Sequence, residues 1–236
     1  MSRTAVLVLA VLALAVASAP AAAQQSISLN IGYFDVRGES SRVAGDTIAA
    51  NLYADPPFAL SYWVPDFNNL TVGAEWLLPL GQFLEVGAGV NYYSETIPSF
   101  YRDLTSKPSD SEITQSLRMQ QIPVTGTLRL IMTGRRATVQ PYVGAGVAIV
   151  PWEYSEAGDF VDSDLNIFNW TYKDSGTAVG AVVFGGLRVK INRTVALGTE
   201  FRYQMVDAPL DPNVGFQGTR LDLSGLTYQA SLIFRF

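Results

Sequence analysis

Apolar residues recur at every second position in eight stretches of this chain. A period of two places successive side chains on opposite faces of an extended strand, so each stretch predicts a strand with one apolar face and one mixed face. Pro123 lies within the fourth stretch, and because proline cannot donate to a sheet ladder we expect an irregularity there. The predicted strands cover residues 26–34, 70–78, 83–93, 117–132, 137–152, 176–189, 194–205 and 225–236.

The connections between these strands alternate in length. Three short turns are predicted over residues 79–82, 133–136 and 190–193, and four long loops over residues 35–69, 94–116, 153–175 and 206–224. This alternation is typical of up-and-down barrels that cross an outer membrane. We therefore predict an all-β fold, an eight-stranded antiparallel up-and-down transmembrane β-barrel with four long extracellular loops and three short periplasmic turns. In the first loop, residues 58–64 are a candidate to extend a hairpin above the membrane, and whether residues 35–69 add a hairpin is left open.

The first residues follow a different pattern. Arg3 precedes an apolar run from Ala5 to Ala17, and small residues dominate from Ser18 to Ala23. A basic start, a short apolar run and a small-residue cleavage motif predict a secretory signal peptide over residues 1–23. The outer-membrane β-barrel domain is then expected over residues 24–236. The apolar run is too short for a spanning helix, which needs about 20 residues.

Composition narrows the possible functions. The chain has no cysteine, which excludes disulfides and thiolate metal sites. It carries 16 basic and 21 acidic residues, a net charge of −5, and a negative chain is a poor candidate for binding nucleic acid. We expect no nucleic-acid partner and no cofactor.

Charged residues fall on the mixed faces of the predicted strands. In a membrane barrel the apolar face meets lipid, so these residues must point into the lumen. The candidate lumenal residues are Glu75, Glu85, Arg129, Arg188, Glu200, Arg202 and Arg235. They would form either a selectivity site or a network of ion pairs that fills the barrel, and we favour the network because lumenal polar groups are usual in this architecture. By phase, the interior also receives Tyr142, Val182, Phe184 and Ile233.

The third long loop is rich in acidic residues, including Glu153, Glu156 and Asp174. Carboxylate oxygens are ligands that Ca²⁺ prefers, which makes its remaining acidic residues, Asp159, Asp162 and Asp164, candidate metal ligands. Their spacing lacks the full signature of a calcium loop. A solvated acidic loop is therefore the favoured interpretation.

The last stretch carries a resemblance to a known family. Residues 225–236 resemble the closing strand of bacterial outer-membrane β-barrels, whose C-terminal Phe and alternating apolar residues form the signal read by the barrel assembly machinery. The residues that match this signal are Tyr228, Leu232, Phe234 and Phe236. In architecture, almost all of the chain after the signal peptide resembles the small eight-stranded barrels grouped with outer membrane proteins A, X and W and the opacity proteins.

This resemblance implies a location and a set of partners. The protein is expected in the outer membrane of a diderm, Gram-negative-type bacterium, with both termini in the periplasm. Expected partners are outer-membrane lipid, lipopolysaccharide, the barrel assembly machinery and, during transit, periplasmic chaperones. The barrel itself is expected to be a monomer.

Three classes of function compete. The first is a non-enzymatic barrel with a structural or surface-loop-mediated binding role and no large pore, and the second is a small porin-like channel for ions or small apolar solutes. An outer-membrane enzyme is the third class. The chain has no histidine and no nucleophile-elbow motif, so we expect no catalytic residues and favour the first class.

Overall fold

The computed structural model describes residues 25–107 and 109–236. Nine main strands build the sheet, and all of their pairings are antiparallel. They are β1 (Ser26–Val36), β3 (Asn69–Leu80), β4 (Leu84–Ser106), β5 (Ser111–Gln121), β6 (Val124–Ile131), β7 (Val139–Val161), β8 (Ile167–Lys190), β9 (Val195–Met205) and β12 (Gly225–Arg235). The signal peptide expected over residues 1–23 lies outside the described residues.

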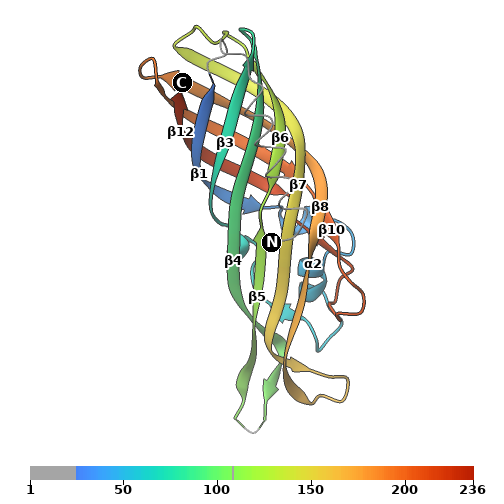
Figure 1. The fold of residues 1–236 in the computed structure, drawn as a ribbon. Coiled ribbons are helices and arrows are strands. Elements are labelled where there is room, and N and C mark those ends of the chain that lie inside the picture. The colour runs from blue at the N-terminus through green and yellow to red at the C-terminus, as the bar shows by residue number, and fades with distance from the viewer. Residues whose placement is uncertain (1–24, 108) are drawn as a thin grey trace.

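The sheet closes into a ring (Figure 1). Strand β1 pairs with β3 on one edge and with β12 on the other, so the first and last strands meet. Strands β5 and β6 both lie between β4 and β7 and together make one wall position, which gives eight positions in total. Ile122 and Pro123 separate these two strands, where an irregularity was predicted. The predicted eight-stranded antiparallel barrel is confirmed.

The two ends of the barrel differ. Short turns join β3 to β4, β6 to β7 and β8 to β9 at the upper end in Figure 1, which we call the short-turn end. At the opposite, long-loop end, β4, β5, β7 and β8 extend far beyond the other strands. Residues 94–116 and 153–175 were predicted as loops, and this was wrong, because both segments are largely strand. Two of the four long connections are therefore hairpins that prolong the barrel wall.

The first connection folds into short elements. It contains the 3-10 helices η1 (Glu39–Ser41) and η2 (Val64–Phe67), the helix α2 (Thr47–Leu52) and the strand β2 (Leu60–Ser61). Asp46 caps the start of helix α2, because its carboxylate accepts a hydrogen bond from the backbone N–H of Ala49 (3.0 Å) and so satisfies a free donor of the first turn. Within residues 58–64, β2 pairs with Phe100 and Tyr101 of β4, so this segment adds a short strand to the β4–β5 hairpin. The last connection adds the pair β10 (Asp207–Pro209) and β11 (Arg220–Asp222).

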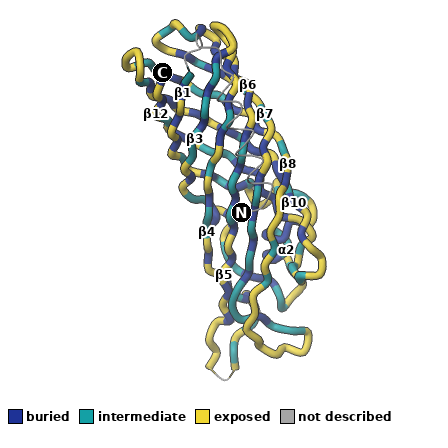
Figure 2. Tube along the Cα trace, in the orientation of Figure 1, coloured by how far each residue is buried: buried dark blue, intermediate teal, exposed yellow. Residues whose placement is uncertain are grey.

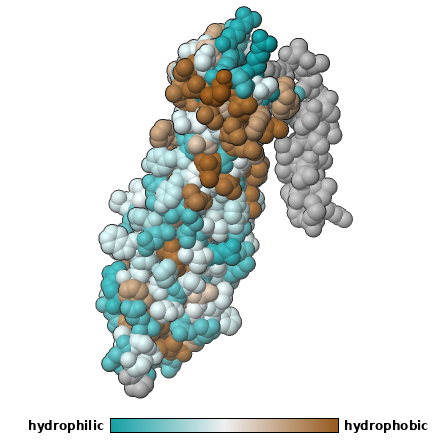
Figure 3. Space-filling model, turned by 90° about the vertical axis from the view of Figure 1, so that its left-hand side faces the viewer, coloured by the Kyte–Doolittle hydropathy of each residue, from teal (hydrophilic) through white to brown (hydrophobic). Residues whose placement is uncertain are grey.

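An apolar belt surrounds the half of the barrel nearer the short-turn end. Figure 3 shows it as a hydrophobic band on a molecule that is otherwise mostly polar on the face in view, and Figure 2 shows buried and exposed positions alternating along the strands. The exposed apolar side chains include Leu29 and Ile31 of β1, Val147 of β7 and Leu197 of β9. Such a belt matches the lipid-facing surface of a membrane barrel. In the described part of the chain, no helix has the length and apolarity needed to cross a bilayer.

Aromatic residues border this belt. Towards the short-turn end lie Trp76 and the exposed rings of Phe234 and Phe236. Towards the long-loop end lie exposed Tyr33, Tyr92 and Phe201, together with half-buried Tyr203. Rings with one apolar and one wet side suit the two membrane interfaces.

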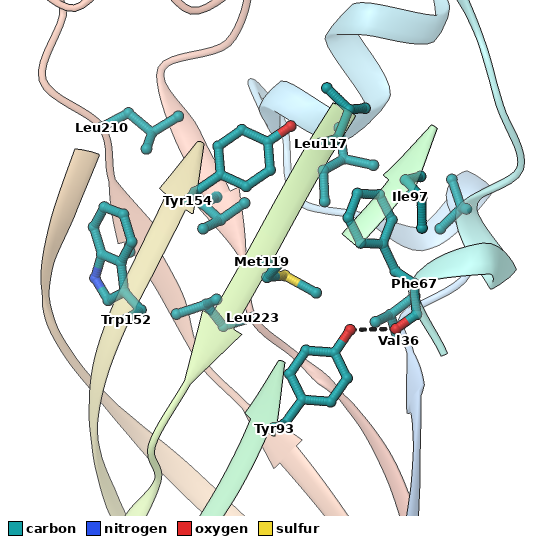
Figure 4. Packing of buried hydrophobic residues seen from close by; sticks show 14 of the residues in the cluster. Val36, Phe67, Tyr93, Ile97, Leu117, Met119, Trp152, Tyr154, Leu210 and Leu223 are labelled. Carbon is teal, nitrogen blue, oxygen red and sulfur yellow. Dashed lines mark hydrogen bonds between the residues drawn. The ribbon is translucent and has the colours of Figure 1, made fainter. Parts of the chain in front are cut away.

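A second apolar region fills the interior of the long-loop end (Figure 4). It includes residues from the extended walls, such as Tyr93, Leu117 and Tyr154, and residues from the first and last connections, such as Phe67 and Leu223. The hydroxyl of Tyr93 donates a hydrogen bond to the carbonyl of Phe67, which ties β4 to η2. We call this region, with α2, η2, β10 and β11, the long-loop module. Beyond the apolar belt, the barrel is thus packed like a water-soluble domain, apolar inside and polar outside.

Candidate functional site

The middle of the lumen holds a compact network of charges. Glu75 of β3, Arg129 of β6 and the pair Glu200 and Arg202 of β9 point inward and are buried. Nη2 of Arg129 donates to Oε2 of Glu75 (2.9 Å) and to Oε2 of Glu200 (3.1 Å). Nε of Arg202 donates to Oε1 of Glu200 (2.9 Å). Two carboxylates and two guanidinium groups therefore balance, and we call these four residues the middle tier.

Neutral side chains complete the hydrogen bonding of the middle tier. The hydroxyl of Tyr142 and the amide of Gln229 donate to the two carboxylate oxygens of Glu200 (3.0 and 2.9 Å), and the hydroxyl of Thr127 donates to Glu75 (3.0 Å). Aromatic rings cover the cations, since the guanidinium carbon of Arg129 lies 4.4 Å from the centre of the Tyr142 ring. The guanidinium carbon of Arg202 lies 5.1 Å from the centre of the Phe184 ring. Buried charges that are paired and hydrogen-bonded in this way are costly to break singly.

A second group of charges lies nearer the short-turn end. Arg188 of β8 donates two hydrogen bonds to the carboxylate of Glu85 on β4 (3.1 and 3.0 Å), and Nε of Arg135, in the turn before β7, lies 3.4 Å from the same carboxylate. Sequence reasoning expected Arg235 to join a carboxylate as well. Instead, Nη2 of Arg235 donates to Oε1 of Gln140 (3.2 Å). Arg135, Arg188, Arg235 and Glu85, with Lys190 at the end of β8, are called the end tier below.

A small cavity separates the middle tier from the long-loop module. Its volume is about 20 Å³, which is enough for one water molecule. Thr125 and Arg202 line it on the lumenal side, and Tyr93 and Gln121 line it on the other. The hydroxyl of Thr125 makes no hydrogen bond within the described residues, so this cavity offers a polar position suited to water.

The interior of the long-loop module contains one prominent carboxylate. Oε1 of Glu156 on β7 accepts hydrogen bonds from the side-chain amide of Asn51 (2.7 Å) and from the hydroxyl of Tyr154 (2.9 Å). Within the described residues, no cation lies within ion-pair distance of Glu156. Burial raises the pKa of this carboxyl above its ordinary range, although both hydrogen bonds act in the opposite direction. Glu156 was expected on a solvated loop, and that expectation was wrong because the segment is a strand with this side chain turned inward.

The candidate metal ligands lie around the tip of the β7–β8 hairpin. Oδ1 of Asp162 accepts hydrogen bonds from the backbone N–H groups of Asp164 and Asn166 (2.9 and 2.8 Å), so this carboxylate shapes the turn. Asp159 accepts from the amide of Asn169 (2.8 Å). Within the described residues, no three acidic side chains come together in a way that could hold a metal ion.

The four residues of the predicted assembly signal share one face of β12. Tyr228, Leu232 and Phe234 are exposed to the outside of the barrel, as is Phe236 after the strand. The ring of Tyr228 packs edge-on against Phe201 of β9, with centroids 5.6 Å apart. This placement leaves the four side chains accessible, while the role in assembly stays a prediction.

Sequence reasoning missed three participants in these sites. Arg135 falls in the predicted turn over residues 133–136, Gln140 in the predicted strand over residues 137–152, and Asn51 in the long loop over residues 35–69. Only Gln140 carried a signal, since its phase within a predicted strand directs it inward. Arg135 and Asn51 lie on irregular backbone, where no period tells the direction of a side chain.

Comparisons with known proteins agree with this geometry. A family model described as the outer membrane protein beta-barrel domain matches residues 9–236. The chain belongs to this family. Membership places the protein in the outer membrane of a Gram-negative bacterium, and the predicted resemblance in architecture to small eight-stranded barrels is confirmed. No match to a curated protein accompanies this family assignment.

Solved structures of other outer-membrane proteins share the fold. The outer membrane protein OprG from Pseudomonas aeruginosa is 12% identical, with 91% of this chain and 96% of that chain covered and a TM-score of 0.54. Ail of Yersinia pestis, solved with the heparin analogue sucrose octasulfate, is 11% identical over 91% of this chain and 99% of its own, with a TM-score of 0.46. Outer membrane protein W of E. coli is 16% identical over 91% and 98%, with a TM-score of 0.45. At such identities the likeness shows the fold alone.

Proposed function

We propose that this member of the family is a closed outer-membrane barrel that presents its long-loop module as a binding surface and forms no large pore. The observation that supports this most strongly is the apolar core that fills the long-loop end. Residues from the first connection (Ile48, Leu52, Phe67) and from the last (Leu221, Leu223) are buried against the inner faces of the walls. A mouth packed in this manner has no room for a permanent aqueous path.

The middle tier supplies a second barrier in series. Arg129 bridges Glu75 and Glu200 across the lumen, and the rings of Tyr142 and Phe184 pack beside it. An eight-stranded barrel is only just wide enough for its side chains, so a bridged network occupies the cross-section. These lumenal carboxylates are paired with guanidinium groups, and this pairing favours a structural role for the carboxylates over a catalytic one. We therefore propose that the protein is not an enzyme.

We infer the orientation from the general arrangement of outer-membrane barrels. In outer-membrane barrels the short turns face the periplasm and the long connections face outward. We place both termini of the barrel in the periplasm and the long-loop module outside the cell, where it neighbours lipopolysaccharide. Transit with periplasmic chaperones, insertion by the barrel assembly machinery and a monomeric barrel remain part of the proposal.

The β7–β8 hairpin offers the best binding surface on this module. Phe160, Phe168, Trp170 and Tyr172 lie on its face, with Phe160 4.8 Å from Tyr172 and 6.2 Å from Phe168 between ring centroids. Trp170 is 58% exposed and Phe168 is 37% exposed, whereas Tyr172 is half-buried and Phe160 is buried beneath its neighbours, so Phe168 and Trp170 supply the accessible surface. We call these four residues the aromatic stripe. Aromatic rings that keep an exposed face suit ligands with mixed apolar and polar surfaces, such as the sugars of lipopolysaccharide.

A conductance measurement tests whether the barrel is closed to ions. Refolded protein in a planar bilayer is expected to give small or rare openings, and a steady conductance as large as that of a 16-stranded porin would contradict the proposal. The alternative function, a small channel for ions or small apolar solutes, predicts saturable uptake of such solutes into proteoliposomes. A closed barrel shows no uptake above that of protein-free vesicles.

Binding to the module is tested separately. Trp170→Ala is expected to weaken the binding of purified lipopolysaccharide to protein in detergent, whereas Trp63→Ala serves as a matched control. Trp63 is also exposed (76%) but belongs to the first connection and is not part of the aromatic stripe. Equal binding by both variants and the wild type would remove the aromatic stripe from the proposal.

A further inference from the structure

Charge is distributed unevenly between the two lumenal tiers. The middle tier balances, with Glu75 and Glu200 against Arg129 and Arg202. The end tier does not balance, because Glu85 is its single acidic residue while Arg135, Arg188, Lys190 and Arg235 are all basic. Nη1 of Arg129 also lies 4.0 Å from Oε2 of Glu85, so a further cation shares this one carboxylate.

The surrounding turns increase the imbalance. The connections over residues 81–83, 132–138 and 191–194 contain Arg135, Arg136 and Arg193 and no Asp or Glu. The whole chain nevertheless has a net charge of −5. Acidic residues are therefore concentrated elsewhere, and the short-turn end is the basic pole of an acidic protein.

Two cations of the end tier lack an acidic partner. Within the described residues, no carboxylate lies within ion-pair distance of Lys190 or Arg235. Both residues lie within electrostatic reach of Arg135 and Arg188, and Arg235 also lies within reach of Glu85, so this one carboxylate faces several cations in one mouth. Arg235 is 8% exposed, and its neighbour Ser26 on β1 is 2% exposed. A guanidinium that is buried among other cations favours a bound anion over empty space.

The guanidinium of Arg235 is also held in place. It donates to Oε1 of Gln140, and Nε2 of Gln140 in turn donates to the backbone carbonyls of Arg135 (2.7 Å) and Ala137 (2.9 Å). The neutral amide thus orients the cation without neutralising it. A planar guanidinium fixed in this way is preorganised to meet two oxygens of a tetrahedral anion.

We propose that the short-turn mouth of the barrel binds a phosphate-type oxyanion between Arg235 and Lys190. Arg235 supplies a directed pair of donors, and Lys190 supplies a flexible point charge. Arg188 and Arg135 stay with Glu85 and add to the positive potential. The anion is either free phosphate or the phosphate of an anionic phospholipid in the leaflet that surrounds the short-turn end.

Binding of free phosphate is measured first, on the wild-type barrel folded in an uncharged detergent. Inorganic phosphate is compared with chloride at equal ionic strength. The wild type is expected to bind phosphate and to unfold at a higher temperature in its presence, as read from the heat-dependent shift in gel mobility. Arg235→Gln and Lys190→Gln are each expected to weaken binding about tenfold or more, the loss of a charge-assisted hydrogen bond. Arg193→Gln is the matched control, because it removes a cation from a turn outside the end tier.

The lipid source is tested in nanodiscs of phosphatidylcholine with and without phosphatidylglycerol. If the headgroup is the ligand, phosphatidylglycerol raises the unfolding temperature of the wild type and of Arg193→Gln but not of the two end-tier variants. If Arg235→Gln does not fold, Lys190→Gln alone is compared with the wild type and with Arg193→Gln. The proposal is overturned if the wild type and the end-tier variants bind phosphate equally and phosphatidylglycerol changes their unfolding temperatures equally.

Discussion

The amide of Asn51 donates a 2.7 Å hydrogen bond to the carboxylate of Glu156, which joins helix α2 of the first connection to the wall strand β7. The two residues are 105 positions apart in the chain. Both are buried, and Tyr154 donates to the same carboxylate oxygen. A carboxylate with no cationic partner within the described residues therefore connects the wall of the barrel to the segment that fills it.

This contact predicts a dependence of stability on pH. Burial raises the pKa of Glu156 in the folded protein, so the folded state holds its proton at pH values where the unfolded chain has lost it. The contribution of Glu156 to stability is full below the ordinary carboxyl pKa of about 4.3 and declines as the pH rises through the raised value. Glu156→Gln keeps an oxygen that can accept from Asn51 and removes the charge. At neutral pH we expect it to increase the free energy of unfolding in urea.

The difference between Glu156→Gln and the wild type should shrink as the pH falls towards 4. Glu112→Gln is the control, since Glu112 is exposed on β5. A variant whose advantage is the same at every pH would show that folding does not raise the pKa of Glu156.

The middle tier predicts a large cost for losing one cation. Arg129→Ala leaves Glu75 and Glu200 facing each other in the lumen without their shared partner. We expect the barrel to lose about 3–5 kcal/mol of unfolding free energy, the usual cost of breaking a buried ion pair from one side. Arg118→Ala, which removes an exposed arginine from β5, should change stability by less than about 1 kcal/mol. Similar losses in the two variants would argue against a network that stabilises the barrel.

The membrane-spanning half of the fold could be predicted because two solvents act on each strand. Lipid selects apolar residues on one face, such as Val86 and Val90 of β4, and the lumen tolerates Glu85 and Asn91 on the other. Alternation is then strong, and each strand shows it independently of the rest of the chain. For the same reason the inward direction of Arg129, Arg188 and Arg202 followed from phase alone.

The extended half could not be predicted in the same way, because the apolar face changes sides outside the bilayer. In β7 the exposed apolar residues Val147 and Ile149 give way to buried Trp152 and Tyr154, which have the opposite phase. Where the two patterns meet, both faces of the strand are apolar, and beyond this point the outer face is polar. A pattern that shifts by one residue looks like the end of a strand. The hydrogen-bond partners of Arg235 and Asn51 could not be predicted from the sequence either, since they depend on long-range packing.

The position of Phe236 predicts an effect on assembly. Its ring is 64% exposed beside the last strand, where it does not contribute to a packed interior. Deleting Phe236 should therefore leave the stability of refolded protein nearly unchanged but lower the amount of folded barrel in the outer membrane. The measurement is the fraction of heat-shifted protein in isolated membranes. Phe83→Ala, which removes another exposed ring near the short-turn end, is the control, and wild-type yield from the deletion would refute the role in assembly.

The tip of the β7–β8 hairpin provides the sharpest test of orientation. Asp164 is exposed in the turn after β7, and Gln82 is exposed in the short turn between β3 and β4, at the opposite end of the barrel. Because the chain has no cysteine, Asp164→Cys and Gln82→Cys each introduce a single thiol. A membrane-impermeant maleimide added to intact cells should label Asp164→Cys at once, and it should label Gln82→Cys only after the outer membrane is broken. The reverse pattern would place the long-loop module in the periplasm and remove surface binding as its function, while leaving the phosphate proposal for the short-turn mouth to its own test.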